Sequence, residues 1–302
     1  MMRKMARDGS PDSGVNDDAL AAFVGVRRRL FGIAYRMLGS SAEAEDVVQD
    51  VWLRWQATDR SVVLDAAAFL STTTMRLAIN VAQSAYARRE TYIGPWLPEP
   101  VDTSADPTLG AERGEALELA VLLLLEKLSP TERAAYVLRE AFDYSYREIA
   151  EILDLGEANA RQLVTRARKH IEDERRSPVA AGEQERLLHA FIAAAQEGEI
   201  GALEALLAAD VVSYSDGGGV ARAARVPVAG RERVASFVAS FASHFWTGVT
   251  LAWRETNGQA SVLVSRESKA IVLATVDASA EGIGRIMWVM NPAKLSAFQQ
   301  SI

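Results

Sequence analysis

Apolar residues at helical spacing divide residues 17–90 into three predicted helices, which together form a first all-helical domain. The first helix ends at Gly39, and the second begins after Ser40, with Glu43 at the capping-box position. The second helix places valines and tryptophans on one stripe and leaves acidic and amide side chains on the opposite face. The third helix follows Asp65.

A proline-rich stretch, residues 91–111, comes next and is expected to be an extended linker. It holds four of the nine prolines of the chain, namely Pro95, Pro98, Pro100 and Pro107. It also contains Tyr92, Trp96 and Leu97, although a passive spacer seldom carries such large apolar side chains. We therefore expect the linker to dock on another part of the protein.

A second all-helical domain spans residues 112–176 and contains a predicted helix-turn-helix. Residues 144–153 form one amphipathic helix, residues 154–156 a short turn and residues 157–170 a second helix. The outward positions of this second helix carry side chains suited to base edges and phosphates, namely Glu157, Asn159, Arg161, Gln162, Thr165 and Arg166. A helical hairpin with a solvated basic face is the alternative explanation.

Strand-like runs dominate the remainder, residues 182–302, and predict an α+β domain with a curved antiparallel sheet. Two short helices at about 183–197 and 200–208 precede a strand at 211–215. A turn, Asp216-Gly217-Gly218-Gly219, and a helix from about Arg231 to His244 follow. Further strands are expected at about 249–254, 260–265, 270–276 and 284–290, with Asn257-Gly258 as a hairpin turn.

The composition excludes several kinds of site. The chain has no cysteine, which rules out disulfides, thiolate zinc sites and cysteine nucleophiles. Its three histidines, His170, His189 and His244, show no metal-ligand spacing. We expect no metal site, no cofactor and no catalytic residue.

The formal net charge of −7 does not exclude a DNA partner, because binding depends on the local field. Basic residues gather at two places, Arg88-Arg89 and the run Arg161, Arg166, Arg168 and Lys169. Residues 1–16 are polar and are expected to be a disordered tail rather than a signal peptide. The most apolar run, Leu119 to Leu125, is too short to cross a bilayer, so we expect a cytoplasmic protein with no membrane contact.

Together, these blocks resemble the extracytoplasmic-function (group IV) sigma factors of RNA polymerase. The resemblance rests on the sequence Ala44-Glu45-Asp46-Val47-Val48-Gln49-Asp50-Val51-Trp52 in the first domain. In the second domain it rests on Leu128-Ser129-Pro130-Thr131-Glu132-Arg133 and on residues 146–168. The resemblance implies two sigma domains, region two and region four, the latter with the helix-turn-helix.

The resemblance implies core RNA polymerase and promoter DNA as partners. Region two is expected to bind the clamp helices of the largest subunit through Asp46, Gln49 and Asp50, and region four to lie near the flap. Candidates for reading the minus-ten element are Arg60, Arg76, Asn80, Arg88 and Arg89. The outward residues of the second helix of the helix-turn-helix would read the minus-thirty-five element.

Three further motifs are similar to those of the SigJ-type subgroup, which carries a SnoaL-like (NTF2-like) cone domain at its C-terminus. They are Trp96-Leu97-Pro98-Glu99-Pro100, Asp216-Gly217-Gly218-Gly219 and Asn291-Pro292-Ala293-Lys294-Leu295. The chain departs from the subgroup at Val220 and Ala293, where a basic and an acidic residue are common. By this resemblance the second and third motifs would contact the linker and regulate the placement of the sigma domains.

Two alternatives remain open from the sequence. A helix-turn-helix regulator with a ligand-sensing domain would explain the second and third domains but not the acidic helix of the first. A SnoaL-like enzyme fused to a DNA-binding module would need acid-base groups in the cone, for which Tyr214, Asp216, His244 and Trp246 are the candidates. Whether a small ligand enters the C-terminal domain, and which oligomeric state the chain adopts, stays undecided.

Overall fold

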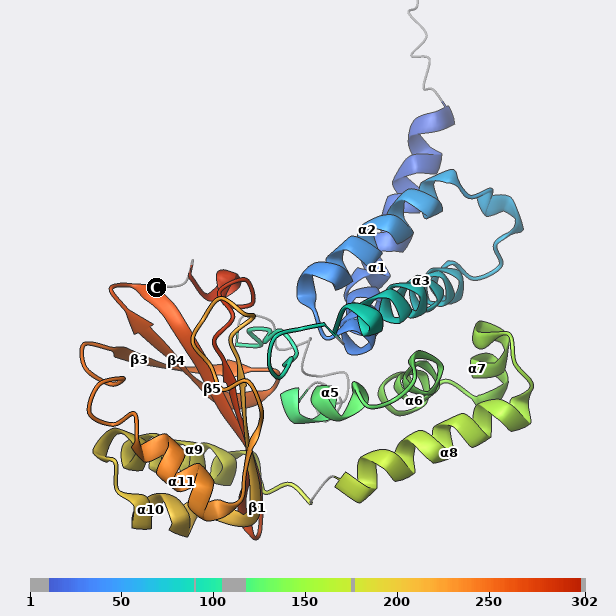
Figure 1. Ribbon diagram of the computed structural model, residues 1–302. Coiled ribbons are helices and arrows are strands. Elements are labelled where there is room, and N and C mark those ends of the chain that lie inside the picture. Colours follow the sequence, from blue (N-terminus) through green and yellow to red (C-terminus); the bar gives the residue numbers. More distant parts are fainter. Residues whose placement is uncertain (1–10, 90, 105–117, 175–176, 300–302) are drawn as a thin grey trace, which may run out of the picture.

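The computed structural model describes residues 11–89, 91–104, 118–174 and 177–299. Two helical units and a sheet-containing domain follow one another along the chain (Figure 1). No helix within these described ranges is long and apolar enough to cross a membrane.

The first helical unit contains α1 (Pro11–Leu38), α2 (Ser41–Ala57), the short helix η1 (Arg60–Val62) and α3 (Ala66–Arg89). As predicted, α1 stops before Gly39, whose φ of 63° favours glycine, and the Ser40 hydroxyl accepts a hydrogen bond from the amide of Glu43. The start differs from the prediction, because α1 begins at Pro11, earlier than the expected cap at Asp17.

The second helical unit contains α5 (Leu119–Leu125), α6 (Pro130–Phe142), α7 (Tyr146–Leu153) and α8 (Glu157–Glu174). Ser129 and Ser145 each form a capping box at the start of a helix, with Glu132 and Glu148 respectively. The chain turns between α7 and α8 at Asp154, whose φ is 56°. The predicted helix-turn-helix is therefore present.

The two helical units share one hydrophobic core rather than forming separate ones. In Figure 1, α6 lies between α3 of the first unit and α8 of the second. The buried guanidinium of Arg133 on α6 donates to the carbonyl oxygen of Arg36 on α1, at 2.9 Å. This contact fixes the second unit against the first.

The C-terminal domain is built on a six-stranded sheet with the order β2-β1-β6-β5-β4-β3. The helices α9 (Ala181–Glu197), α10 (Ile200–Leu206) and α11 (Arg231–Ala239) pack on one face (Figure 1). The strands are β1 (Leu207–Asp216), β2 (Val228–Ala229), β3 (Thr250–Thr256), β4 (Gln259–Arg266), β5 (Lys269–Ser279) and β6 (Gly282–Val289). Asn257 and Gly258 turn the chain between β3 and β4 with φ of 54° and 71°, as the hairpin signal predicted.

Two sequence-based expectations for this domain were wrong. The sheet is mixed rather than antiparallel, because β1 pairs parallel with β6. The predicted helix from Arg231 to His244 ends at Ala239 and continues as turns. The aromatic side chains after Ala239 line a cavity instead of one face of a helix.

The opposite face of the sheet is covered by the linker and by α5. Leu97 of the linker, Leu119 and Ala120 of α5 and Met287 of β6 belong to one hydrophobic cluster, and Leu97 is fully buried. Burying a leucine side chain contributes about 1.5–3 kcal/mol relative to leaving it in water. The sheet thus holds both the linker and the start of the second helical unit.

Candidate functional site

The linker runs in extended form between the helical units and the sheet domain. The amide of Glu99 donates to the carbonyl oxygen of Gly39, at 2.7 Å, which joins the linker to the end of α1. Further along, Val101 and Asn257 exchange two hydrogen bonds, at 2.9 and 3.0 Å, which join the linker to the β3–β4 hairpin. The predicted docking of the linker is confirmed.

Asp216 is the central acceptor of the linker contact. Its carboxylate is fully buried at the end of β1 and accepts from the Tyr92 hydroxyl at 2.6 Å, the Leu97 amide at 2.9 Å and the Lys294 ammonium at 2.7 Å. It also accepts from the amide of Gly218 at 3.1 Å, as expected for a turn residue. A fully buried carboxylate needs hydrogen-bond donors to replace water, and these four donors supply them.

Lys294 and Trp96 complete the contact. The Lys294 ammonium lies 4.2 Å from the centre of the Trp96 ring and also donates to the carbonyl oxygen of Leu97. The guanidinium carbon of Arg89 lies 3.6 Å from the same ring centre, so two cations contact one indole. Asn291 donates to the Tyr92 hydroxyl at 2.9 Å. We call Tyr92, Trp96, Asp216, Asn291 and Lys294 the linker cluster.

Burial perturbs two groups of the linker cluster. Burial lowers the pKa of Lys294, and the neighbouring Asp216 carboxylate partly offsets this effect. The pKa of Tyr92 is raised far above its usual range, first by burial and then by the hydrogen bond to Asp216. The phenol therefore stays protonated and remains a donor to Asp216.

Most of the motif residues predicted to regulate lie at this contact. The Leu97 amide donates to Asp216, and the Leu97 side chain shares a hydrophobic cluster with Leu295. Trp96 contacts Lys294, Gly218 lies against Asn291, and Gly219 lies against Ile93 of the linker. Pro98, Gly217 and Pro292 are neighbours of these residues in the chain. Gly218 has a φ of 63°, and a Cβ there would lie 2.5 Å from Nδ2 of Asn291. Only glycine allows the turn to approach the tail so closely.

Sequence reasoning gave no joining role to four further residues that connect the domains, namely Tyr35, Ser41, Glu99 and Asn257. The Glu99 carboxylate accepts from the Ser41 amide at 2.9 Å and the Ser41 hydroxyl at 2.6 Å, at the start of α2. The buried Tyr35 hydroxyl donates to the carbonyl oxygen of Glu99 at 2.6 Å and accepts from Asn257 at 2.7 Å. Glu99 lies between Pro98 and Pro100 of the linker motif, and a carboxylate between two prolines was a signal that the sequence offered.

The outward face of α8 is as predicted. Glu157, Asn159, Arg161, Gln162, Thr165 and Arg166 are all exposed. Arg161 forms an ion pair with Glu157 at 3.2 Å, and Arg166 forms one with Glu132 at 3.0 Å. The Arg161–Glu157 pair is fully on the surface, where ion pairs contribute little, whereas the Glu132 side chain is only 13% exposed.

The residues predicted to read the minus-ten element are dispersed. Asn80 is exposed on α3, and Arg60 lies 5.9 Å from the centre of the Trp55 ring. Arg76 donates to the carbonyl oxygens of Ile152 and Glu151 at the end of α7, at 3.0 and 3.2 Å.

Arg89 is held in the linker contact, where it forms an ion pair with Glu126. The side chain of Arg88 lies outside the described residues. The three residues predicted to bind polymerase, Asp46, Gln49 and Asp50, are all exposed on one side of α2.

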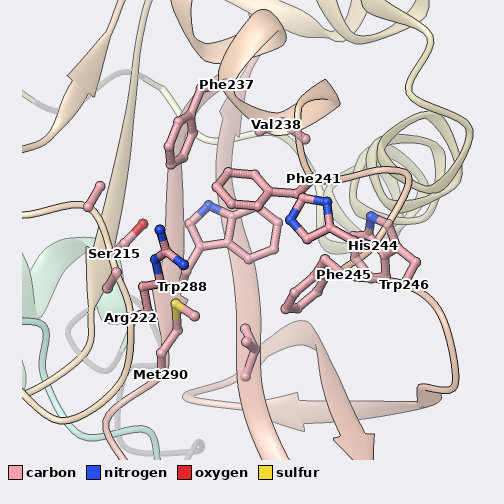
Figure 2. Close-up of a pocket in the computed structure, with 13 residues that line it drawn as sticks. Ser215, Arg222, Phe237, Val238, Phe241, His244, Phe245, Trp246, Trp288 and Met290 are labelled. Carbon is pink, nitrogen blue, oxygen red and sulfur yellow. The ribbon is translucent and has the colours of Figure 1, made fainter.

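A cavity of about 530 Å³ lies within the C-terminal domain, on the same side of the sheet as α11 (Figure 2). His244 and Trp246 line it together with several further aromatic side chains. Tyr214 and Asp216, the other two candidates named for the enzyme alternative, are not among the residues that line it. Tyr214 packs against the hydrophobic cluster under the linker, and Asp216 binds the linker.

Comparisons with known proteins match every part of this architecture. Residues 23–90 match the family described as Sigma-70 region 2, and residues 118–171 match Sigma-70, region 4. The chain is 35% identical over 237 residues to the ECF RNA polymerase sigma factor SigJ of Mycobacterium tuberculosis, which covers 76% of this chain and 75% of that protein. It is 29% identical over 293 residues to the probable ECF RNA polymerase sigma factor SigI of the same species, covering 95% and 98%.

The crystal structure of M. tuberculosis SigJ is similar over both the helical and the sheet-containing parts. The TM-score is 0.74 at 30% sequence identity, and the match covers 92% of this chain and 98% of that one. The order of two helical units and a sheet domain is thus shared over almost the full length of both proteins.

Proposed function

Because this chain belongs to the extracytoplasmic-function sigma factors of RNA polymerase and directs transcription initiation, we propose that its SnoaL-like domain regulates that activity by holding the linker. The chain is a transcription initiation factor rather than an enzyme. Sigma factors bind core RNA polymerase and promoter DNA.

The observation that carries the proposal is the position of Asp216. One buried carboxylate of the sheet domain accepts hydrogen bonds from both Tyr92 and Leu97 of the linker. The same linker is bonded at Glu99 to the ends of α1 and α2. The sheet domain therefore acts on the helical units through the segment that sets the distance between them.

The arrangement of the helical units supports a closed state. Arg76, a candidate for reading DNA, is bonded to the last carbonyl oxygens of α7 in the helix-turn-helix. Arg133 binds α1 in the shared core. Two promoter elements that are separated along the DNA require the two units to move apart. Opening would release Arg76 for the minus-ten element.

We assign the surface contacts by chemistry. Asp46, Gln49 and Asp50 form an acidic, exposed stripe on α2 that would complement a basic polymerase surface. The exposed face of α8, including Asn159, Arg161 and Gln162, would enter the major groove at the minus-thirty-five element. Arg60, Asn80 and Arg76 would follow the minus-ten strand.

The regulation works through tethering. The linker cluster joins parts of one chain, so its contacts form at high effective concentration and need not be strong individually. Polymerase binding that favours separated units would shift the chain to an open state, in which the linker leaves Asp216. The sheet domain would thus set how much binding energy polymerase must supply.

The test is in vitro transcription with core polymerase at limiting sigma factor, comparing the full chain with Trp96→Ala and Asp216→Asn. Both variants are expected to give more promoter-specific transcript, because each weakens the closed state. Asp277→Asn is the matched control, since Asp277 pairs with Arg285 within the sheet at 2.8 Å. Output from both linker variants equal to that of the control would refute the proposal.

Point variants of the full chain are preferable to a truncation after Arg176. Removing the sheet domain would expose Leu97, Leu119 and Ala120, which are buried against it. Such a truncated protein would combine loss of regulation with a new apolar surface. A truncation that transcribes like Trp96→Ala would nonetheless support the same conclusion.

A further inference from the structure

The cavity of the C-terminal domain is a separate feature from the linker cluster. It has a volume of about 530 Å³, within the range of roughly 300–1,000 Å³ that is usual for small-molecule sites. We propose that it binds a planar aromatic acid and that its occupancy is transmitted to the linker. The coupling half of this inference rests on the proposed function, whereas the binding half does not.

The walls of the cavity favour a flat apolar molecule. Phe237 and Phe241 meet edge to face, with ring centres 5.1 Å apart, and Phe245 and Trp246 do the same at 4.9 Å. Trp288 of β6 supplies a further ring (Figure 2). Aromatic rings arranged edge to face leave ring faces and edges for a planar guest, and such contacts are geometrically specific.

Arg222 favours an acidic group on that molecule. In Figure 2 the Arg222 side chain projects towards Trp288, on the same side of the cavity as Ser215 and Met290. Within the described part of the chain, Arg222 makes no ion pair, and none of the residues that line the cavity is acidic. A guanidinium group binds a carboxylate through two parallel hydrogen bonds, so the site suits an aromatic carboxylate.

Two segments of chain connect the cavity directly to the linker cluster. Ser215 lines the cavity, and the next residue is Asp216. Met290 also lines the cavity, and its amide donates to the carbonyl oxygen of Asp216 at 2.8 Å. The residue after Met290 is Asn291, which donates to the Tyr92 hydroxyl.

The turn formed by Gly217, Gly218 and Gly219, here called the glycine turn, provides a third connection between the cavity and the linker. Arg222, Ala223 and Ala224 line the cavity and follow the glycine turn in the chain. A Cβ on Gly219 would lie 3.1 Å from Ile93 of the linker, and one on Gly94 would lie 3.7 Å from the carbonyl oxygen of Ala224. A molecule that orders this loop would therefore order the surface on which the linker rests.

The binding test uses isothermal titration of the full chain with 2-naphthoate and with the neutral naphthalene-2-methanol. We expect 2-naphthoate to bind more tightly, and Arg222→Gln to weaken its binding on the order of tenfold with little effect on the alcohol. Arg225→Gln is the matched control, because Arg225 is exposed in the same loop but does not line the cavity. No binding of 2-naphthoate, or equal binding to the wild type and Arg222→Gln, would overturn the site.

The coupling test measures hydrogen exchange of the Leu97 amide, which donates to Asp216, with and without saturating 2-naphthoate. Slower exchange in the bound protein is expected, and unchanged or faster exchange would overturn the coupling. The two proposals fail separately. If 2-naphthoate binds through Arg222 while Trp96→Ala and Asp216→Asn transcribe like the control, the site stands and the proposed regulation falls.

Discussion

Replacing Asp216 by asparagine keeps the shape of the side chain and removes its charge. Asp216 is fully buried and its partner Lys294 is 9% exposed, so water cannot replace the lost partner. Removing one member of a buried ion pair costs about 3–5 kcal/mol, because the other charge stays buried. The new amide group would also face the Tyr92 hydroxyl and the Leu97 amide, which are both donors.

The assay is native-state hydrogen exchange at the Leu97 amide, which is protected by its bond to Asp216. Since each 1.4 kcal/mol changes an equilibrium about tenfold, the exchange rate is expected to rise on the order of 100-fold or more. The Trp96 environment should change in parallel, because Lys294 contacts its ring. Mass spectrometry of peptides from residues 91–104 resolves the effect.

The matched control is Asp277→Asn. Asp277 of β5 and Arg285 of β6 are 14% and 13% exposed, and Arg285 also donates to the carbonyl oxygen of Glu174 in α8 rather than to the linker. This variant should destabilise the domain without selectively accelerating exchange at Leu97. Equal acceleration in the two variants, or an unchanged rate in Asp216→Asn, would refute the reasoning that Asp216 holds the linker.

Three other changes have defined outcomes. Gly39→Ala would place a Cβ 2.7 Å from the Trp96 ring at a φ of 63°, so limited proteolysis should cut the linker faster. Arg161→Ala should weaken minus-thirty-five DNA binding by about 1–3 kcal/mol in a mobility-shift assay with holoenzyme, and most strongly at one base pair. Ser145→Ala should lower the free energy of unfolding by about 1 kcal/mol, because the helix α7 loses its cap. Because Ser145 lowers the pKa of Glu148 below 4.5, the part of this stability that depends on Glu148 is present above pH 4.5 and is lost as the pH falls through the lowered pKa.

The first two changes have matched controls. Gly25→Ala in α1 meets nothing within 4 Å and should leave the linker protected, so equal cleavage in both variants would contradict the first prediction. Arg186→Ala, on the exposed surface of α9, should not change DNA binding. For Ser145→Ala, an unchanged melting temperature at pH 7 would contradict the third.

Local patterns predicted much of the fold because they depend on neighbouring residues. Ser40 as a cap, the turn at Asp154 and the hairpin at Asn257 are set by backbone preferences within a few residues. The outward face of α8 follows from helical periodicity, and the linker aromatics indicated docking. The surface on which the linker docks was predicted from the similarity of three motifs to those of the SigJ-type subgroup. The chemistry of the residues alone did not identify it.

Long-range pairings could not be read in this way. The parallel pairing of β1 with β6 joins the first and the last strand of the domain in sequence, and no short sequence pattern predicts such a pairing. Arg76 looks in sequence like any basic residue on a helix, and its bonds to α7 depend on how two units pack. Asn257 is a turn residue by sequence, yet its side chain also contacts Tyr35 of α1.

The position of Lys294 in the chain has a consequence for protein synthesis. Its ammonium group binds Asp216 and contacts Trp96, but the ribosome adds it only after both helical units have been made. At roughly 5–20 residues per second, the helical units precede Lys294 by on the order of ten seconds. During that interval a nascent chain has both helical units but lacks the contacts that Lys294 makes in the linker cluster, so the proposed closed form can assemble only after translation has passed Lys294.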